Sequence, residues 1–287
     1  MPELPEVETV RIQLFLRLKG KTIDSVKIHH DKSVRGDRRF ATALKGLRID
    51  DIDRVGKLLI FSFEGKNDLF LLVHLKMTGQ LFLIDKSGSR QAAGGHETKH
   101  DSTLPNRHTR VEFDLKDGTK LCFNDQRIFG YLKLTDKKGL AAAKDRFGPE
   151  PHQGALDFDY FFSRLQKSGR NLKAMLLDQT FVAGLGNIYV DESLFRAGLA
   201  PTRAARSLTA AEAKRLLREA AKVLKEAIRH GGTTFQSFKD STGKKGNYTG
   251  KLKVFARQGL PCPRCGHIIL KSKVAGRGTH YCPQCQK

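Results

Sequence analysis

The first twenty residues carry apolar side chains at the spacing of a helix. Four of them recur every three or four residues and fall on one face: Val7, Val10, Leu14 and Leu18. Pro5 suits the first turn of such a helix, and Gly20 suits its end. The pattern therefore predicts an amphipathic helix that begins in LPEVETV and stops at Gly20.

After residue 20 the apolar positions alternate with a period of two, which is typical of strands. Seven short runs show it: 22–30, 58–63, 68–75, 80–84, 110–115, 120–123 and 131–134. Asp117-Gly118 between two of these runs is a strong hairpin signal. We expect a mostly antiparallel sandwich or barrel up to about residue 135, with the polar stretch 85–109 as a long surface loop.

Beyond the break GPEP at 148–151, the pattern returns to helical spacing. Four helices are predicted, within 157–166, 171–179, 188–198 and 209–232. Thr209 and Glu212 have the spacing of a capping box, and Gly231 marks the end of the last helix. The sequence thus predicts an α+β, multidomain protein with domains at 1–140, 153–255 and 256–287, and a linker at 141–152.

Charge narrows the class of partner. The 52 Lys and Arg residues exceed the 30 Asp and Glu residues by 22, which predicts binding to an anionic polymer such as nucleic acid. A merely soluble basic protein is the alternative. No apolar run approaches the roughly 20 residues needed to span a bilayer, and the acidic, proline-containing start does not fit a secretory signal.

Four cysteines near the C-terminus have the spacing of a metal site. Cys262 and Cys265 form one Cys-x-x-Cys pair, Cys282 and Cys285 form another, and 16 residues separate the pairs. This arrangement predicts one structural Zn²⁺ with four cysteine ligands, in preference to a redox pair. The fifth cysteine, Cys122, alternates with apolar residues and is expected to be a buried strand thiol.

Two further segments suggest chemistry. Glycines flank Arg277, so its guanidinium can project toward a phosphate or a DNA groove, although a solvated arginine fits equally well. At the other end, removal of Met1 would leave Pro2 with a free secondary amine, which can attack a carbonyl-like carbon. Glu3 and Glu6 are near enough to move protons. A disordered terminus is the alternative reading of Pro2 alone.

Together these residues resemble the bacterial formamidopyrimidine-DNA glycosylase family of 8-oxoguanine repair enzymes. The resemblance runs through PELPEVETV, VGKLLIF, HLKMTGQL, DQRIFG, FGPEP, LLDQTFVAGLGNIYVDESLFRAG and the cysteine hairpin. It implies an N-terminal catalytic β-sandwich with flanking helices, a helix-two-turn-helix domain and a zinc finger. It also implies a bifunctional glycosylase and AP lyase that acts on damaged double-stranded DNA. We expect a monomer in the bacterial cytoplasm, associated with the nucleoid.

The resemblance also implies roles for individual residues. The catalytic residues would be Pro2 as Schiff-base nucleophile, Glu3 as proton donor, Glu6 in support, Lys57 near the lesion phosphate, and Arg277 in the elimination steps. Met77, Arg127 and Phe129 would enter the gap left by the extruded base. Further DNA contacts are expected from five residues: His74, His108, Arg170, Lys173 and Asn187, the last of which is also expected to cap a helix.

The sequence departs from the family pattern in three places. Gln126 and Ile128 stand where proline and a second arginine are usual, and Thr78 follows Met77 where other small or acidic residues occur. Two other functions are alternatives: an endonuclease VIII-like glycosylase for oxidised pyrimidines, and a catalytically silent DNA-binding zinc protein. PELPEVET with Arg127 and Phe129 favours the purine enzyme, and an intact Pro2 opposes the silent protein.

Overall fold

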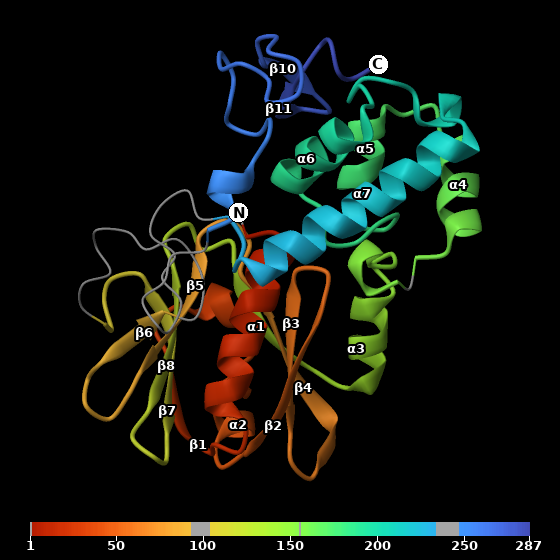
Figure 1. The fold of residues 1–287 in the computed structure, drawn as a ribbon. Coiled ribbons are helices and arrows are strands. Elements are labelled where there is room, and N and C mark those ends of the chain that lie inside the picture. The colour runs from red at the N-terminus through yellow and green to blue at the C-terminus, as the bar shows by residue number, and fades with distance from the viewer. Residues whose placement is uncertain (1, 93–103, 155, 234–246) are drawn as a thin grey trace. The chain divides into compact units, whose positions relative to one another are not determined.

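The computed structural model describes residues 2–92, 104–154, 156–233 and 247–287, without the side chains of 90–92. The chain forms two compact units, and neither is continuous in sequence (Figure 1). The first unit comprises 1–145 and 230–247, and the second comprises 146–229 and 248–287. Parts of the expected loop at 85–109 and of the segment after Thr233 lie outside the described residues.

The first unit contains two antiparallel sheets. One has the strand order β1-β7-β8-β5-β6 and the other β2-β3-β4-β9. The strands are β1 (Ile23–Ile28), β2 (Ile49–Val55), β3 (Leu58–Phe63), β4 (Lys66–His74), β5 (Gly79–Ile84), β6 (Arg90–Ala92), β7 (Thr109–Leu115), β8 (Lys120–Asp125) and β9 (Tyr131–Thr135). The helices are α1 (Leu4–Leu18), α2 (Phe40–Leu44) and α3 (Lys137–Lys144), with a 3₁₀ turn at Asp31–Val34.

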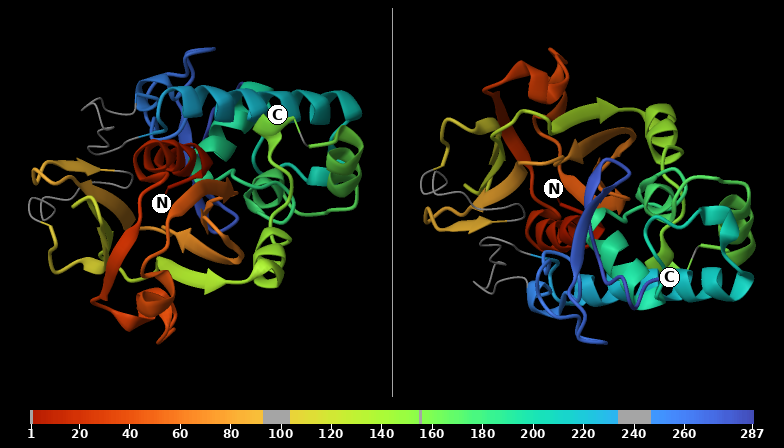
Figure 2. Two further views of the ribbon diagram at one scale, coloured as in Figure 1. Left: turned by 90° about the horizontal axis from the view of Figure 1, so that it is seen from below. Right: turned by 90° about the horizontal axis from the view of Figure 1, so that it is seen from above.

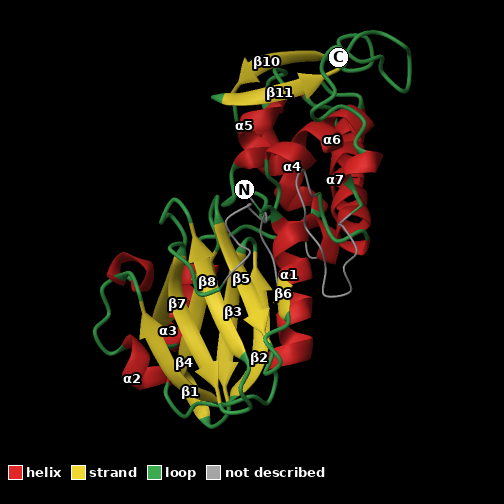
Figure 3. Ribbon diagram, turned by 90° about the vertical axis from the view of Figure 1, so that its left-hand side faces the viewer, coloured by secondary structure: helices red, strands yellow, loops and turns green. Residues whose placement is uncertain are grey.

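Helix α1 runs beside the sheets and closes their apolar core (Figure 3). Its four predicted core residues, Val7, Val10, Leu14 and Leu18, are all buried. They join one cluster with side chains from both sheets, among them Phe61 and Phe113. The helical period predicted from the sequence is therefore confirmed, and the helix contributes one wall of the core of the β-sandwich.

The predicted strands and the hairpin are confirmed. Asp117 and Gly118 lie in the turn between β7 and β8, where Gly118 has a φ of +85° and its N–H donates to the Leu115 carbonyl at 2.9 Å. Cys122 on β8 is buried, as its alternating neighbours indicate. The alternation did not reveal β2, whose sequence IDDIDRV has four charged residues in seven and buries only part of one face.

The second unit is helical and carries the cysteine hairpin. Its elements are α4 (Phe158–Gln166), α5 (Leu172–Leu177), α6 (Asn187–Ala197), α7 (Ala210–Arg229), β10 (Leu270–Val274) and β11 (Arg277–Tyr281), with 3₁₀ turns at Pro151–Gln153, Ala205–Ser207 and Thr249–Lys251. Helix α7, the long cyan helix in Figure 2, packs against α6. Thr209 and Glu212 form the predicted capping box, because each backbone N–H donates to the other side chain.

Within the described parts of the chain, no helix is long and apolar enough to cross a membrane.

Helix α1 offers a direct test of the sandwich core. Replacing the fully buried Leu14 by alanine should lower the free energy of unfolding of the first unit by about 2–5 kcal/mol, because it leaves a cavity between the helix and the sheets. Leu16 lies on the same helix and is 74% exposed, so Leu16→Ala should change it by less than about 0.5 kcal/mol. Urea unfolding followed by circular dichroism measures both; equal losses would contradict the assigned face.

Candidate active site

The start of α1 brings Pro2, Glu3 and Glu6 together. Glu3 is the N-cap of the helix, and Glu6 at the third helical position completes a capping box with it. In this box Glu6 Oε2 accepts the Glu3 backbone N–H at 2.8 Å. All three residues are buried, and the capping box fixes both glutamates at the start of α1, directly after Pro2. Sequence spacing alone predicts this grouping.

Glu6 also holds a segment that is 227 residues away in sequence. Its Oε1 accepts the backbone N–H of Thr233 at 2.7 Å and the Thr233 hydroxyl at 3.0 Å. Gly232 has a φ of +80°, and a Cβ there would lie 2.6 Å from Glu6 Oε1, so glycine is required for this approach. The sequence analysis missed this contact, because nothing in the local pattern links Thr233 to the N-terminus.

Lys57 and His74 lie at one end of the four-stranded sheet. Lys57 is in the turn between β2 and β3, and its neighbour Leu58 pairs with His74, which in turn pairs with Tyr131. The His74 Nδ1 accepts the Lys76 backbone N–H at 3.0 Å. Burial, together with the positive charges of Lys76, Lys57 and Arg35, lowers the pKa of His74 to about 3. His74 is therefore neutral at physiological pH, with its proton on Nε2.

Met77, Arg127 and Phe129 come together from two turns of the first unit. Met77 follows β4 and Phe129 follows β8, and they are 41% and 51% exposed despite being large and apolar. The Arg127 guanidinium contacts both: its Nη1 is 3.4 Å from the Met77 sulfur, and its Cζ lies 4.6 Å from the centre of the Phe129 ring. These three residues, called the wedge residues below because they are expected to enter the gap left by the extruded base, thus form one exposed cluster.

Asp125 lies behind this cluster and is fully buried. It is the last residue of β8, where it pairs with Gly79 of β5, and its backbone N–H donates to the His108 carbonyl at 2.9 Å. His108 is itself half-buried beside Arg107, whose Nε is 3.1 Å from His108 Nε2. The sequence analysis placed His108 in the site but gave Asp125 no role.

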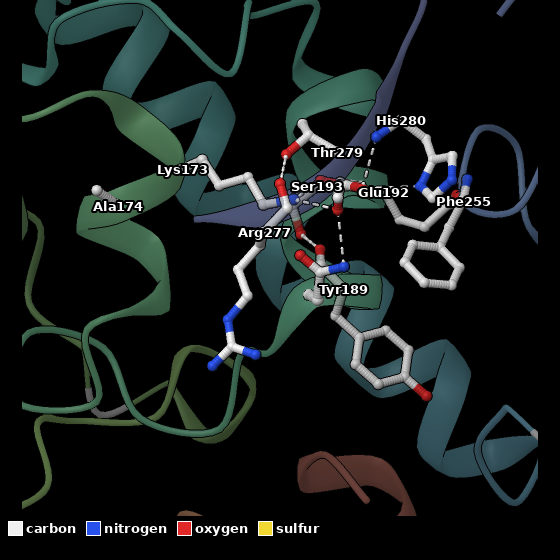
Figure 4. Close-up of polar contacts among 12 residues, drawn as sticks. Lys173, Ala174, Tyr189, Glu192, Ser193, Phe255, Arg277, Thr279 and His280 are labelled. Atoms are coloured by element: carbon white, nitrogen blue, oxygen red, sulfur yellow. Dashed lines mark hydrogen bonds and ion pairs between the residues drawn. The ribbon is translucent and has the colours of Figure 1, made fainter. Parts of the chain in front are cut away.

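In the second unit, Arg277 and the start of α6 lie close together. Asn187 Nδ2 donates to the Gly278 carbonyl at 2.9 Å, next to Arg277 on β11. The Arg277 side chain is exposed and points away from the strand (Figure 4). The expectation that Asn187 caps α6 is wrong: Gly186 is the N-cap and Asn187 is the first helical residue. Its side chain holds the hairpin instead of the helix N–H groups.

Lys173 does not present its charge to solvent. Its side chain is fully buried, with Nζ 2.7 Å from Asp191 Oδ1 and 3.2 Å from the Gly278 carbonyl. Asp191 Oδ2 in turn accepts the His280 backbone N–H at 2.9 Å. In Figure 4 Lys173 points toward β11. Lys173 therefore anchors the strand that carries Arg277, and its DNA contact stays a prediction.

Arg170 differs from Lys173 although both precede the same turn. Its side chain is about half exposed and pairs with Asp178 at 2.8 Å. A second nitrogen of its guanidinium donates to the Ala174 carbonyl at 3.0 Å. Arg170 thus remains at the surface, where the sequence analysis placed it.

The four predicted metal ligands converge. The sulfur atoms of Cys262, Cys265, Cys282 and Cys285 all lie within 4.8 Å of one another, with Cys262 and Cys285 separated by 3.9 Å and Cys265 and Cys282 by 3.5 Å. Four ligands at about 2.3 Å in a tetrahedron are about 3.8 Å apart, so this set fits Zn²⁺. The donor chemistry, four thiolates with no open position, is that of a structural site.

Comparison with known proteins decides the family. The formamidopyrimidine-DNA glycosylase N-terminal domain matches residues 1–132, the H2TH domain of the same enzymes matches 147–239, and the zinc finger found in FPG and IleRS matches 259–287. The chain belongs to the formamidopyrimidine-DNA glycosylase family. The resemblance seen in the sequence motifs is thereby confirmed, as is the mixed fold with sheets, an H2TH domain and a zinc finger.

Relatives of this family match over the whole chain. The formamidopyrimidine-DNA glycosylases of Heliobacterium modesticaldum and Lactobacillus delbrueckii subsp. bulgaricus are 42% and 40% identical, with full coverage of both chains. Among solved structures, a complex between Lactococcus lactis Fpg and DNA containing an abasic site superposes with a TM-score of 0.87 at 35% identity, again over the full length of both chains.

The buried ion pair of Lys173 and Asp191 predicts how the stability of the second unit changes when Lys173 is replaced. Lys173→Met should lower the free energy of unfolding by about 3–5 kcal/mol, because it leaves the Asp191 charge buried without its cation. Arg170→Met removes a surface pair and should cost less than about 1 kcal/mol. Thermal and urea unfolding of both variants measure these free energies. An unchanged free energy of unfolding for Lys173→Met would contradict the buried Lys173–Asp191 ion pair.

His74 predicts a pH dependence of stability. Its pKa is about 3 in the folded protein against 6.5 in the unfolded chain, so the unfolded chain binds the extra proton between these values. Stability should fall as pH drops from 6.5 toward 3, by at most about 1.4 kcal/mol per pH unit from this group, and should be insensitive to it above 6.5. His74→Gln should lose this slope in urea unfolding at stepped pH; an unchanged slope would assign the effect to other groups.

Proposed function

We propose that this protein is a base-excision-repair DNA glycosylase that removes oxidised purines, 8-oxoguanine and formamidopyrimidines, and then nicks the strand as an AP lyase by β,δ-elimination. One observation carries the proposal: the Pro2–Glu3–Glu6 group at the start of α1, in a chain whose family membership spans its whole length. Lactococcus lactis Fpg has been solved with DNA containing an abasic site, and a mutant of it with DNA containing Fapy-dG, which supports the substrate class.

Pro2 would act as the nucleophile once Met1 is removed. Its neutral secondary amine attacks C1′ of the damaged nucleotide and the N-glycosidic bond breaks. The base leaves with that bond's electron pair and takes up the proton that the Pro2 nitrogen loses. Opening of the sugar ring then leaves an iminium between Pro2 and C1′, and Glu3 supplies the proton to the ring oxygen. Glu6 supports this step by fixing the Glu3 backbone at 2.8 Å.

Lys57 and His74 would hold the phosphate next to the lesion. A neutral His74 whose Nδ1 accepts from Lys76 has its Nε2–H available as a donor to a phosphate oxygen. Lys57 and Lys76 add positive charge at the same end of the sheet, which favours a phosphate and the departure of a phosphate leaving group. His108 is proposed as a further backbone contact.

Met77, Arg127 and Phe129 would fill the duplex after the damaged base is extruded. Apolar Met77 and Phe129 replace the lost stacking, and Arg127 offers donors to the edge of the base left unpaired. Their exposure as one cluster, held by the Arg127 contacts to both neighbours, supports this assignment. Extrusion costs a few kcal/mol, least for a poorly stacked lesion, so such a wedge favours damaged sites.

The second unit would grip the flanking phosphates. Asn187 at the start of α6 donates to the Gly278 carbonyl, next to the exposed Arg277, and a helix N-terminus together with an arginine is suited to phosphate. Arg170 adds surface charge nearby in sequence. Zn²⁺ held by the four cysteines would fix the hairpin, since so short a segment buries too little apolar surface to fold alone.

The remaining assignments are proposals of organisation. We place a catalytic domain at 1–140, a linker at 141–152, an H2TH domain at 153–255 and a zinc finger at 256–287, which is supported by family matches at 1–132, 147–239 and 259–287. A net charge of +22 supports association with the nucleoid. We also propose that the protein is a monomer, which suits the family.

Borohydride trapping tests the nucleophile. The wild-type protein should form a covalent adduct with a duplex containing 8-oxoguanine or an abasic site. Pro2→Gly should lower excision by at least about a hundredfold, because the secondary amine of the covalent route is gone, while binding to a product analogue persists.

Pro5 provides the matched control, since it lies in the same segment but in the first turn of α1. Pro5→Ala should keep the adduct. Normal turnover by Pro2→Gly, or mass spectrometry that finds Met1 on fully active protein, would refute the role of Pro2.

A further inference from the structure

The side chains of Thr78 and Asp125 join the two turns that carry the wedge residues. Thr78 follows Met77 and Asp125 comes two residues before Arg127. The Thr78 hydroxyl donates to Asp125 Oδ1 in a short hydrogen bond, and it accepts the Arg127 backbone N–H at 3.1 Å. One hydroxyl thus contacts both the carboxylate and the backbone of the second turn.

The Asp125 carboxylate organises the rest of that turn. Oδ1 also accepts the Arg127 N–H at 3.2 Å, and Oδ2 accepts the Gly130 N–H at 2.6 Å. The two ends of the 127–130 segment are therefore fixed to one side chain. The Asp125 main chain is held as well, because its carbonyl accepts Arg110 Nε at 2.8 Å.

Ile128 shows that this segment is held against its own backbone preference. It has a φ of +57°, a left-handed conformation that β-branched residues rarely adopt. Gly130 permits the close approach on the other side, because a Cβ there would lie 2.8 Å from the Phe123 ring and 3.0 Å from Asp125 Oδ2. A strained turn keeps its shape only where the surrounding contacts over-determine it.

We propose that Thr78 and Asp125 are positioning residues that set the spacing of Met77, Arg127 and Phe129, and thereby determine how selectively the protein responds to the base opposite the lesion. This inference rests on the proposed function. The wedge side chains contact one another but are exposed and lie outside the core, and the Thr78–Asp125 pair fixes the backbone from which they project. Arg127 reads a base edge only if its backbone is placed to well within an ångström.

The test uses Thr78→Val, which keeps the shape of the side chain and removes the hydroxyl, with Thr78→Ser as the matched variant that retains it. The readout is the ratio of kcat/KM for 8-oxoguanine opposite cytosine to that opposite adenine. We expect Thr78→Val to lower this ratio about fivefold and Thr78→Ser to keep it within about twofold of wild type. Thr78→Ala, which lacks the hydroxyl but has no extra methyl to accommodate, should repeat the loss.

A double-mutant cycle with Arg127→Ala identifies the route of the effect. If Thr78 acts through Arg127, Thr78→Val should cause no further loss of selectivity in the Arg127→Ala background. The fluorescence of 2-aminopurine placed opposite the lesion should report a looser environment for Thr78→Val than for Thr78→Ser. Thermal unfolding of each variant confirms that the ratios come from folded protein.

Three results would overturn the inference: an unchanged ratio for Thr78→Val, an equal loss on both duplexes, or full additivity with Arg127→Ala. A wild-type protein that shows no selectivity between the two duplexes would also overturn it, since there would be no reading to control. Failure of the proposed function looks different, because wild type itself would then neither excise 8-oxoguanine nor form the borohydride adduct.

Discussion

A buried carboxylate must be surrounded by hydrogen-bond donors, and this requirement fixes the functional segments of both units. Glu6 accepts from Glu3 and Thr233, Asp125 from Thr78, Arg127 and Gly130, and Asp191 from Lys173 and His280. Glu192 accepts the backbone N–H groups of 253–255 and so holds the chain that leads into the cysteine hairpin. Since an unmet buried charge costs several kcal/mol, each carboxylate admits few arrangements of the segments around it.

This mode of anchoring suits a surface that must engage another molecule. Met77 and Phe129 are large and apolar yet 41% and 51% exposed, so the core cannot hold them by packing. The Arg277 side chain is exposed as well, so the core does not hold it either. In each case the side chain projects outward while a carboxylate holds its backbone from behind: Asp125 for the wedge turn and Asp191 for β11. Binding groups are thereby preorganised without being buried, which reduces the ordering cost of binding.

The features that could be predicted from sequence are those whose causes are local. The face of α1, the hairpin at Asp117-Gly118, the capping box of Thr209 and Glu212 and the cysteine pairs all depend on residues a few positions apart. The family motifs extended this to the fold and to the class of enzyme. Strand β2 was missed because its buried positions, Ile49, Ile52 and Arg54, do not alternate. Arg54 is buried there because it pairs with Glu8 on α1, a partner that the spacing of β2 cannot reveal.

The contacts in the site that the sequence did not reveal have the same origin. Lys173 and Arg277 are both cations near glycine-containing turns, and nothing in their local sequence separates an anchor from a DNA contact. The difference is that Asp191 lies 2.7 Å from Lys173, in a helix 18 residues further on. Asn187 was expected to cap α6 because asparagine often does, but the Gly278 carbonyl, 91 residues away, takes its amide. Among the described residues of the second unit, the buried carboxylate of Asp191 is what keeps the Lys173 ammonium inside, while Arg277 stays exposed.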